Sequence, residues 1–238
     1  MGVRRRLMLG YARTPLPCLD KVGAIYGTNK ARVIHNGRSY LDIYERYLRP
    51  IRWQRFALLE LGVYRGESLR MWRAYLPRAT IAGLDVDPGA PAHANDFQVY
   101  VGSQDDPQLL DRIADDHPSL RVVIDDASHI NPLTFASFDR LFPRLRTGGL
   151  YIIEDLAPPG YGRDWPGIEL HSDGTWGRVW PGMQYGPDVS LLDNNRADLD
   201  AFRARLAYDC DLSPWDETLP GMVSFVHQWP GVLIVGRR

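Results

Sequence analysis

Short apolar runs rich in β-branched residues alternate along the chain with stretches in which apolar residues recur every three or four positions. The apolar runs predict strands, and they span residues 56–62, 79–85, 97–102, 120–124, 150–153, 221–227 and 232–235. The stretches of helical period predict helices over 39–48 and 197–206, and helices that begin near Ser68, Pro107 and Asn131. Because strands and helices alternate, we expect an α/β protein with a doubly wound, mostly parallel sheet and right-handed crossovers.

The last two predicted strands are separated by only four residues, 228–231. So short a connection joins antiparallel neighbours, because parallel strands need a crossover of about a dozen residues or more. We therefore expect a C-terminal hairpin whose last strand runs antiparallel at the end of the sheet.

Two stretches interrupt the regular pattern. Residues 1–37 are rich in Gly, Pro and Arg and lack periodicity, which predicts an irregular lead-in. Residues 158–187 are crowded with Gly, Pro and Trp, which is typical of a functional loop over the ligand edge of a sheet. We expect an N-terminal segment over 1–50, whose helix contributes to the site, and a main domain over 51–238 with a long loop or lid at 157–195.

Acidic side chains follow two of the predicted strands. Asp125 and Asp126 end the fourth strand, and Glu154 and Asp155 end the fifth. The carboxyl ends of parallel strands meet at one edge of the sheet, which is where open α/β sheets hold ligands. If the two strands lie near each other, Asp126, Glu154 and Asp155 can meet around one hard cation, with His129 close by.

These acids also have a purely structural interpretation. A single acidic pair after a strand more often caps the next helix or binds loop amides than holds a metal ion. Two such pairs at two strand ends favour the metal site. Because side chains alternate along an extended chain, Asp125 should point away from Asp126 and serve the cofactor or the loop. His129 is either a base beside the metal or a loop histidine with satisfied hydrogen bonds.

A glycine turn after the first strand is a second candidate site. Glu60, Gly62 and Gly66 form the pattern Glu-x-Gly-x-x-x-Gly, and the helix that begins near Ser68 points its amino end into the same space. The pattern lacks the full G-x-G-x-x-G of dinucleotide enzymes and the Lys and Thr of a phosphate loop. It predicts either a nucleotide-type site or a plain strand-to-helix turn.

Polar residues that follow the next two strands favour the nucleotide-type site. Asp85 ends the second strand, where a doubly wound fold presents a carboxylate to ribose hydroxyls. A role in capping or in the turn is the alternative for this residue. Ser103 and Gln104 follow the third strand on a loop that can reach an adenine ring.

Composition and charge narrow the class of partner. Lys and Arg total 28 against 29 for Asp and Glu, so the chain lacks the basic surplus typical of proteins that bind nucleic acids or anionic membranes. No stretch is long and apolar enough for a membrane span or a secretion signal. The two cysteines, Cys18 and Cys210, fit a reducing compartment. We expect a cytoplasmic protein with a small-molecule partner, and leave open whether it forms a homo-oligomer.

Several segments carry a resemblance to a known family. They are Glu60-x-Gly62-x-x-x-Gly66 with Asp85, the run 124–129, the run 148–156 and the lead-in Tyr26-Gly27-Thr28-Asn29-Lys30. Over residues 22–156 the chain resembles the metal-dependent sugar O-methyltransferases of bacterial macrolide and polyketide pathways, of the mycinamicin type. That family has a class I, Rossmann-like methyltransferase fold with a terminal hairpin. The chain departs from the family at Asn29, where Asp is usual, and at Ala127, where Gly is usual.

The resemblance implies a function. It implies S-adenosylmethionine (SAM) and Mg²⁺ as cofactors, with Asp126, Glu154 and Asp155 as metal ligands and His129 as the general base. The candidate cofactor-binding residues are Glu60, Gly62, Gly66, Ser68, Asp85, Ser103, Gln104 and Asp125. The expected reaction is methylation of a hydroxyl of a (deoxy)sugar on a glycosylated secondary metabolite.

The chemistry of these residue types agrees with that reaction. A sugar hydroxyl is a poor nucleophile near neutral pH, and a divalent cation stabilises the oxygen as its proton leaves. Mg²⁺ prefers an octahedron of oxygens, so three carboxylates leave room for two neighbouring hydroxyls and a water. A neutral imidazole can accept the proton.

Two other functions stay open. The expected fold and acidic cluster also resemble those of proteins related to cephalosporin hydroxylases, so a non-methylating enzyme is one alternative. A SAM-binding scaffold without catalysis is the other.

Overall fold

The computed structural model describes residues 18–32, 34–35, 37–156, 168–170, 176–178, 196–211 and 221–238. Seven strands form one sheet in the order β10-β11-β7-β6-β3-β4-β5. Their bounds are β3 Ala57–Leu61, β4 Thr80–Asp85, β5 Gln98–Val101, β6 Leu120–Asp125, β7 Leu150–Glu154, β10 Val223–Trp229 and β11 Val232–Arg237. Strands β5, β4, β3, β6 and β7 are parallel, which confirms the doubly wound α/β sheet.

The C-terminal hairpin is confirmed, but its last strand does not lie at the end of the sheet. Strand β11 is antiparallel to both β7 and β10 and lies between them, so β10 is the edge strand. The side chains from Val232 to Val235 are buried, whereas Ser224 and His227 on β10 are exposed. An apolar strand buries the most side-chain surface when it lies in the middle of a sheet, whereas an edge strand can expose polar side chains to solvent.

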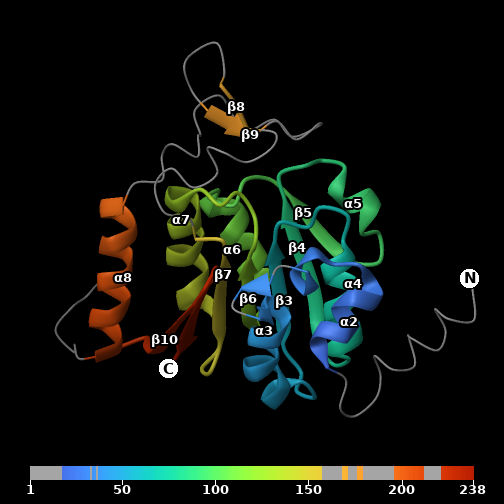
Figure 1. Ribbon diagram of the computed structural model, residues 1–238, viewed down its shortest axis with the longest axis horizontal. Coiled ribbons are helices and arrows are strands. Elements are labelled where there is room, and N and C mark those ends of the chain that lie inside the picture. The colour runs from blue at the N-terminus through green and yellow to red at the C-terminus, as the bar shows by residue number, and fades with distance from the viewer. Residues whose placement is uncertain are drawn as a thin grey trace, which may run out of the picture.

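Helices cover both faces of the sheet (Figure 1). They are α2 Leu19–Tyr26, α3 Tyr40–Leu48, α4 Glu67–Tyr75, α5 Ala90–His93, α6 Pro107–Asp116, α7 Asn131–Leu141 and α8 Arg196–Asp211, with short 3₁₀ turns at Asn29–Ala31, Arg49–Ile51 and Phe142–Arg144. Successive residues of β3 point to opposite faces: Leu58 packs with α2, α3 and α4, and Leu59 packs with α6, α7 and α8. The result is a three-layer structure with two apolar cores. None of the described helices is long and apolar enough to span a membrane.

The prediction of an irregular lead-in over 1–37 is wrong for the part of it that is described. Helix α2 is followed by the 3₁₀ turn Asn29–Ala31 and by the two-residue strands β1 Ile34–His35 and β2 Arg38–Ser39. Leu19 and Val22 are fully buried in the core shared with α3 and α4. A helix of only two turns presents too few apolar residues for its period to stand out in the sequence.

The long loop predicted at 157–195 lies largely outside the described residues, and so does any part it plays over the ligand edge. Within it, β8 Ile168–Leu170 and β9 Trp176–Arg178 pair with each other as antiparallel strands.

The ends of β3 and β6 approach each other closely at Gly62. This residue follows β3 and has a left-handed backbone, with φ +87°. A Cβ atom there would lie 2.1 Å from the carbonyl oxygen of Asp126. The amide of Asp126 in turn donates to the carbonyl of Leu61 at 3.0 Å. Only glycine combines this backbone conformation with so close a neighbour.

We therefore expect Gly62→Ala to destabilise the fold more than Gly27→Ala does. Gly27 also has a positive φ, +81°, but nothing lies within 4 Å of its Cβ position. The conformational penalty alone costs about 1 kcal/mol, and overlap with a backbone atom adds about 1–3 kcal/mol. Urea unfolding of both variants measures the difference, and equal losses of unfolding free energy would contradict the close approach.

Candidate functional site

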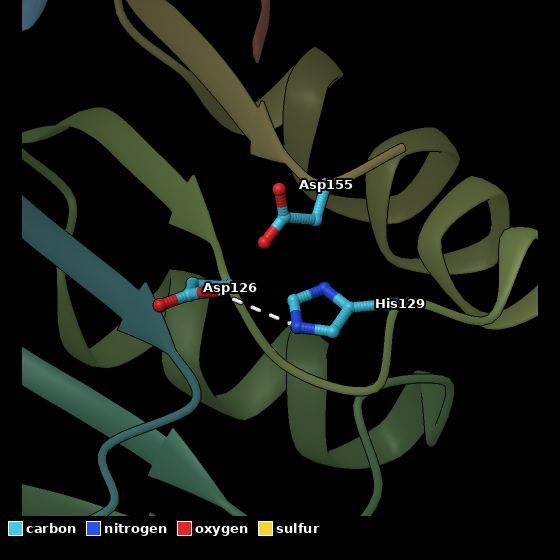
Figure 2. A group of neighbouring side chains, drawn as sticks. All are labelled: Asp126, His129 and Asp155. Atoms are coloured by element: carbon cyan, nitrogen blue, oxygen red, sulfur yellow. Dashed lines mark ion pairs between the residues drawn. The ribbon is translucent and has the colours of Figure 1, made fainter. Parts of the chain in front are cut away.

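Three side chains meet at the carboxyl edge of the sheet (Figure 2). Asp126 follows β6, His129 lies in the same loop, and Asp155 follows β7. One possible ligand atom from each lies within 4.8 Å of the other two. The Nε2 atom of His129 is 3.8 Å from Oδ1 of Asp126, and about a fifth of each of these side chains is exposed. The group is therefore open to a ligand and has the donor atoms of a metal site.

The backbone is strained at the same edge. Among the described residues, left-handed backbone occurs outside glycine at Tyr64, His129 and Asp155, with φ values of 50°, 59° and 49°. These residues follow β3, β6 and β7, which are neighbours in the sheet. Each such residue costs on the order of 1 kcal/mol or more, and strain of this kind gathers at functional sites. A 2.7 Å bond from the amide of Asp155 to the carbonyl of Gly231 helps to hold one of them.

Glu154, the third predicted ligand, is not one of the three residues that meet at the sheet edge. Its carboxylate is 3% exposed and accepts a 2.7 Å hydrogen bond from Nζ of Lys30. Burial, reinforced by the neighbouring Asp126 carboxylate, raises the pKa of Glu154 well above its usual value. The structure therefore brings two of the three predicted ligands, Asp126 and Asp155, together with His129. The role of Glu154 as a ligand stays a prediction.

Lys30 is a residue of the site for which the sequence analysis proposed no role. Its Nζ atom contacts Oδ2 of Asp126 as well as Glu154, and lies 3.4 Å from Oε1 of Glu60. Burial by itself would lower the pKa of Lys30, but the three carboxylates raise it well above its usual value. Lys30 therefore stays charged, although its side chain is only 2% exposed.

Tyr40 reaches Asp155 from the other side of the site. Its hydroxyl donates a short hydrogen bond to Oδ1 of Asp155. The residue opens α3, which starts with a capping box formed by Ser39 and Asp42. Gly231 makes room for the phenol, because a Cβ atom there would lie 2.0 Å from the Tyr40 hydroxyl. The N-terminal segment thus provides a donor to each acid of the cluster.

The glycine turn is braced from inside. Ser68 donates a 2.6 Å hydrogen bond to Oε2 of Glu60, which is fully buried, and burial raises the pKa of Glu60. Gly66 precedes α4 with φ +71°, and a Cβ atom there would lie 2.8 Å from that of Ala94. Glu60 and Ser68 therefore contact each other. Their direct contact with a cofactor stays a prediction.

Asp85 braces the same turn from β4. Its Oδ2 accepts from the amides of Val63 at 2.7 Å and Tyr64 at 2.9 Å, and its Oδ1 accepts from the amide of Asp87 at 2.9 Å. The alternative role of Asp85 in the turn is thus observed. A carboxylate oxygen can accept further bonds, so binding of ribose hydroxyls is compatible with this geometry and stays a prediction.

Asp125 and Gln104 form a buried link behind the metal-site loop. Asp125 accepts from Ser137 at 2.9 Å and from Gln104 at 3.2 Å, and burial raises its pKa to about 6. The other end of the Gln104 amide accepts from the amide of Ser128 at 2.9 Å. Both residues hold the loop in place, which agrees with the loop alternative for Asp125.

Ser103 lies on the surface, where its hydroxyl donates to Asp105. Contacts of Ser103, Gln104 and Asp125 with a cofactor stay predictions.

Comparison with known proteins agrees with this geometry. The chain is 36% identical over 156 residues to L-olivosyl-oleandolide 3-O-methyltransferase of Streptomyces antibioticus, which covers 61% of this chain and 40% of that protein. It is 37% identical over 164 residues to mycinamicin VI 2''-O-methyltransferase of Micromonospora griseorubida, covering 66% of this chain and 39% of that protein. The chain thus spans about two fifths of the length of these relatives. No family model matches.

A solved structure extends the similarity to the fold. The MycE methyltransferase of the mycinamycin pathway, in complex with Mg, SAH and mycinamycin VI, superposes with a TM-score of 0.66. Identity is 30%, and the match covers 93% of this chain and 55% of that one. The chain has the class I methyltransferase fold, and its predicted resemblance to sugar O-methyltransferases of macrolide and polyketide pathways is confirmed.

Because Asp85 holds the turn at Val63 and Tyr64, we expect Asp85→Ala to weaken cofactor binding. Hydrogen bonds to a charged acceptor are worth about 1.5–3 kcal/mol each, so the dissociation constant for S-adenosylhomocysteine (SAH) should rise about tenfold or more. Isothermal titration calorimetry measures this constant. Asp87→Ala is the matched control, because that carboxylate accepts from the amide of Gly89 in the same loop. An unchanged constant for Asp85→Ala would mean that neither the brace nor a ribose contact affects binding.

Proposed function

We propose that this chain is a SAM- and Mg²⁺-dependent O-methyltransferase that methylates a hydroxyl of a (deoxy)sugar on a glycosylated secondary metabolite. The observation that carries the proposal is the meeting of Asp126, His129 and Asp155 at the carboxyl edge of a methyltransferase sheet. The named relatives, which are sugar O-methyltransferases of antibiotic pathways, support it. We place the reaction in the cytoplasm, where Cys18 and Cys210, both free thiols, stay reduced.

The donor atoms of the cluster fit Mg²⁺. Octahedral Mg²⁺ holds its ligands at about 2.1 Å, so no two of them are more than about 4.2 Å apart. Ligand atoms that already lie within 4.8 Å of one another reach that arrangement by small side-chain rotations. Carboxylates suit Mg²⁺ better than imidazole does. Asp126 and Asp155 would therefore hold the ion, and His129 would act as the base.

The side chains divide the chemistry between them. A divalent cation, when bound, lowers the cost of removing a proton from a neighbouring hydroxyl. His129 would accept that proton at Nε2, the nitrogen that faces Asp126. Asp126 and Asp155 would orient two adjacent hydroxyls of the sugar, which favours a vicinal diol as acceptor. Positioning of this kind provides a large part of the rate acceleration in bimolecular reactions.

The turn after β3 would hold the methyl donor. The turn lies at the same sheet edge, next to Asp126, and Asp85 holds two of its amides. We propose that Asp85 binds the ribose and that the loop with Ser103 and Gln104 lies against the adenine. SAM, when bound, supplies an electrophilic methyl group. The acceptor is then a small glycosylated molecule, not a nucleic acid or a membrane lipid, and a homo-oligomer is compatible with this site.

The metal requirement can be tested by methyl transfer. Purified protein is incubated with S-adenosyl-[methyl-³H]methionine and glycosylated macrolides, mycinamicin VI among them, with and without EDTA. We expect transfer in Mg²⁺, a loss of about 100-fold or more in EDTA, and recovery when Mg²⁺ is added in excess. Transfer that is indifferent to the chelator would remove the metal from the proposal.

The role of His129 separates an enzyme from a scaffold. We expect His129→Ala to lower turnover by about 10²–10⁴-fold, because general-base catalysis contributes on that order. Its affinity for SAH should stay within about twofold of wild type, since the ring does not brace the glycine turn. His227→Ala is the control, because His227 lies on edge strand β10 and its ring is hydrogen-bonded to Tyr47 of α3. If both variants behave alike, His129 is not the base.

A further inference from the structure

A buried ammonium group lies among three carboxylates just inside the candidate metal site. Lys30 Nζ contacts Asp126 and Glu154 and lies 3.4 Å from Glu60, and these acids come from three neighbouring strands, β6, β7 and β3. The hydrogen bonds to Asp126 and Glu154 span 96 and 124 residues of sequence. One short 3₁₀ turn of the N-terminal segment thus ties together the three strand ends that form the site.

Lysine is rare in this chain, which makes its presence at position 30 notable. Of the 28 basic residues only two are lysines, Lys21 and Lys30, and the rest are arginines. An ammonium group is a compact point charge with three donors, so it can contact three carboxylates that converge on one point. A planar guanidinium group cannot match that convergence. The residue type at position 30 therefore fits the geometry of the site and not the general preference of the chain.

The two oxygens of Asp126 have different partners. Oδ2 is bound by Lys30 inside the protein, and Oδ1 faces His129 at 3.8 Å on the open side. At Asp155, the hydroxyl of Tyr40 donates to Oδ1. A carboxylate pinned by one oxygen presents the other in a fixed direction. Partners of this kind typically change metal affinity by about 10–100-fold when removed.

We propose that Lys30 is a positioning residue of the metal site, which holds Asp126 by Oδ2 so that Oδ1 faces the cation. This inference rests on the proposed function, because it assumes that a cation binds between Asp126 and Asp155. Lys30 touches neither the cation nor the substrate and acts through the carboxylates that it holds.

A simpler role for Lys30 makes the opposite prediction. If the ammonium group only balances charge, its removal leaves the site more negative, and a cation should bind more tightly. If it positions Asp126, its removal frees the carboxylate to rotate, and the cation should bind more weakly. The sign of the change in metal affinity therefore distinguishes the two roles.

The test introduces Lys30→Met into wild-type protein and into a Glu154→Gln background. The double variant Lys30→Met/Glu154→Gln replaces both members of this buried contact with uncharged side chains. It also avoids leaving Glu154 charged and unpaired, which is the change that would prevent folding. Mn²⁺ serves as the probe in the presence of SAH, with free Mn²⁺ measured by electron paramagnetic resonance, and calorimetry with SAH reports on the fold.

We expect Lys30→Met to raise the Mn²⁺ dissociation constant about tenfold or more in both backgrounds, with SAH affinity within about twofold of the matching parent. The Glu154→Gln single variant keeps the contact between Lys30 and Asp126, so any effect of Glu154 as a ligand is already present in that parent. Equal or tighter Mn²⁺ binding after removal of Lys30 in the Glu154→Gln background would overturn the inference. Absence of Mn²⁺ binding by wild-type protein would instead contradict the proposed metal site itself.

Discussion

The interaction on which the site depends is the contact of one ammonium group with carboxylates from three adjacent strands. Without the ammonium group of Lys30, the carboxylates of Glu60, Asp126 and Glu154 would repel one another in one largely buried volume. Lys30 offsets that repulsion, and the carboxylates hold Lys30 charged in return. Because Glu60 also accepts from Ser68 at the start of α4, the contact joins the metal edge to the turn that we assign to the cofactor. The N-terminal segment, the cofactor turn and the metal loop thus form one connected network.

Hydrogen bonds to the loops after β3 and β6 add to this network. Asp85 holds the turn after β3, and Gln104 links Asp125 to the amide of Ser128 in the loop after β6. These contacts support a backbone that is left-handed at Tyr64, His129 and Asp155. Several predicted cofactor residues therefore also stabilise the loops. The same side chain can stabilise a loop and contact a ligand. A site built in this way is organised before a ligand arrives, which lowers the entropic cost of binding.

Much of the fold could be predicted because its signals are local. Apolar runs of strand length, separated by helical stretches, were enough to predict a parallel sheet, and parallel strand ends imply that Asp126 and Asp155 meet. The contact of Glu154 with Lys30 is not predictable in this way, because the two residues are 124 positions apart in the sequence. The role of Lys30 is not predictable from the sequence, because its partners are up to 124 positions away along the chain. The 3₁₀ turn that contains it is also too short to leave a periodic pattern. To predict that β11 lies inside the sheet and β10 at its edge, one would have to compare how apolar the two strands are.

The central claim is that a divalent cation binds between Asp126 and Asp155 while Lys30 keeps its place behind Asp126. Crystals grown with Mn²⁺ and SAH test it most directly, since anomalous scattering identifies the ion without assumptions about its ligands. We predict an anomalous peak bound by carboxylate oxygens of Asp126 and Asp155, with His129 beside it and Lys30 still in contact with Asp126. An ion that displaces the ammonium group of Lys30 from Asp126, or no peak at this edge of the sheet, would contradict this prediction.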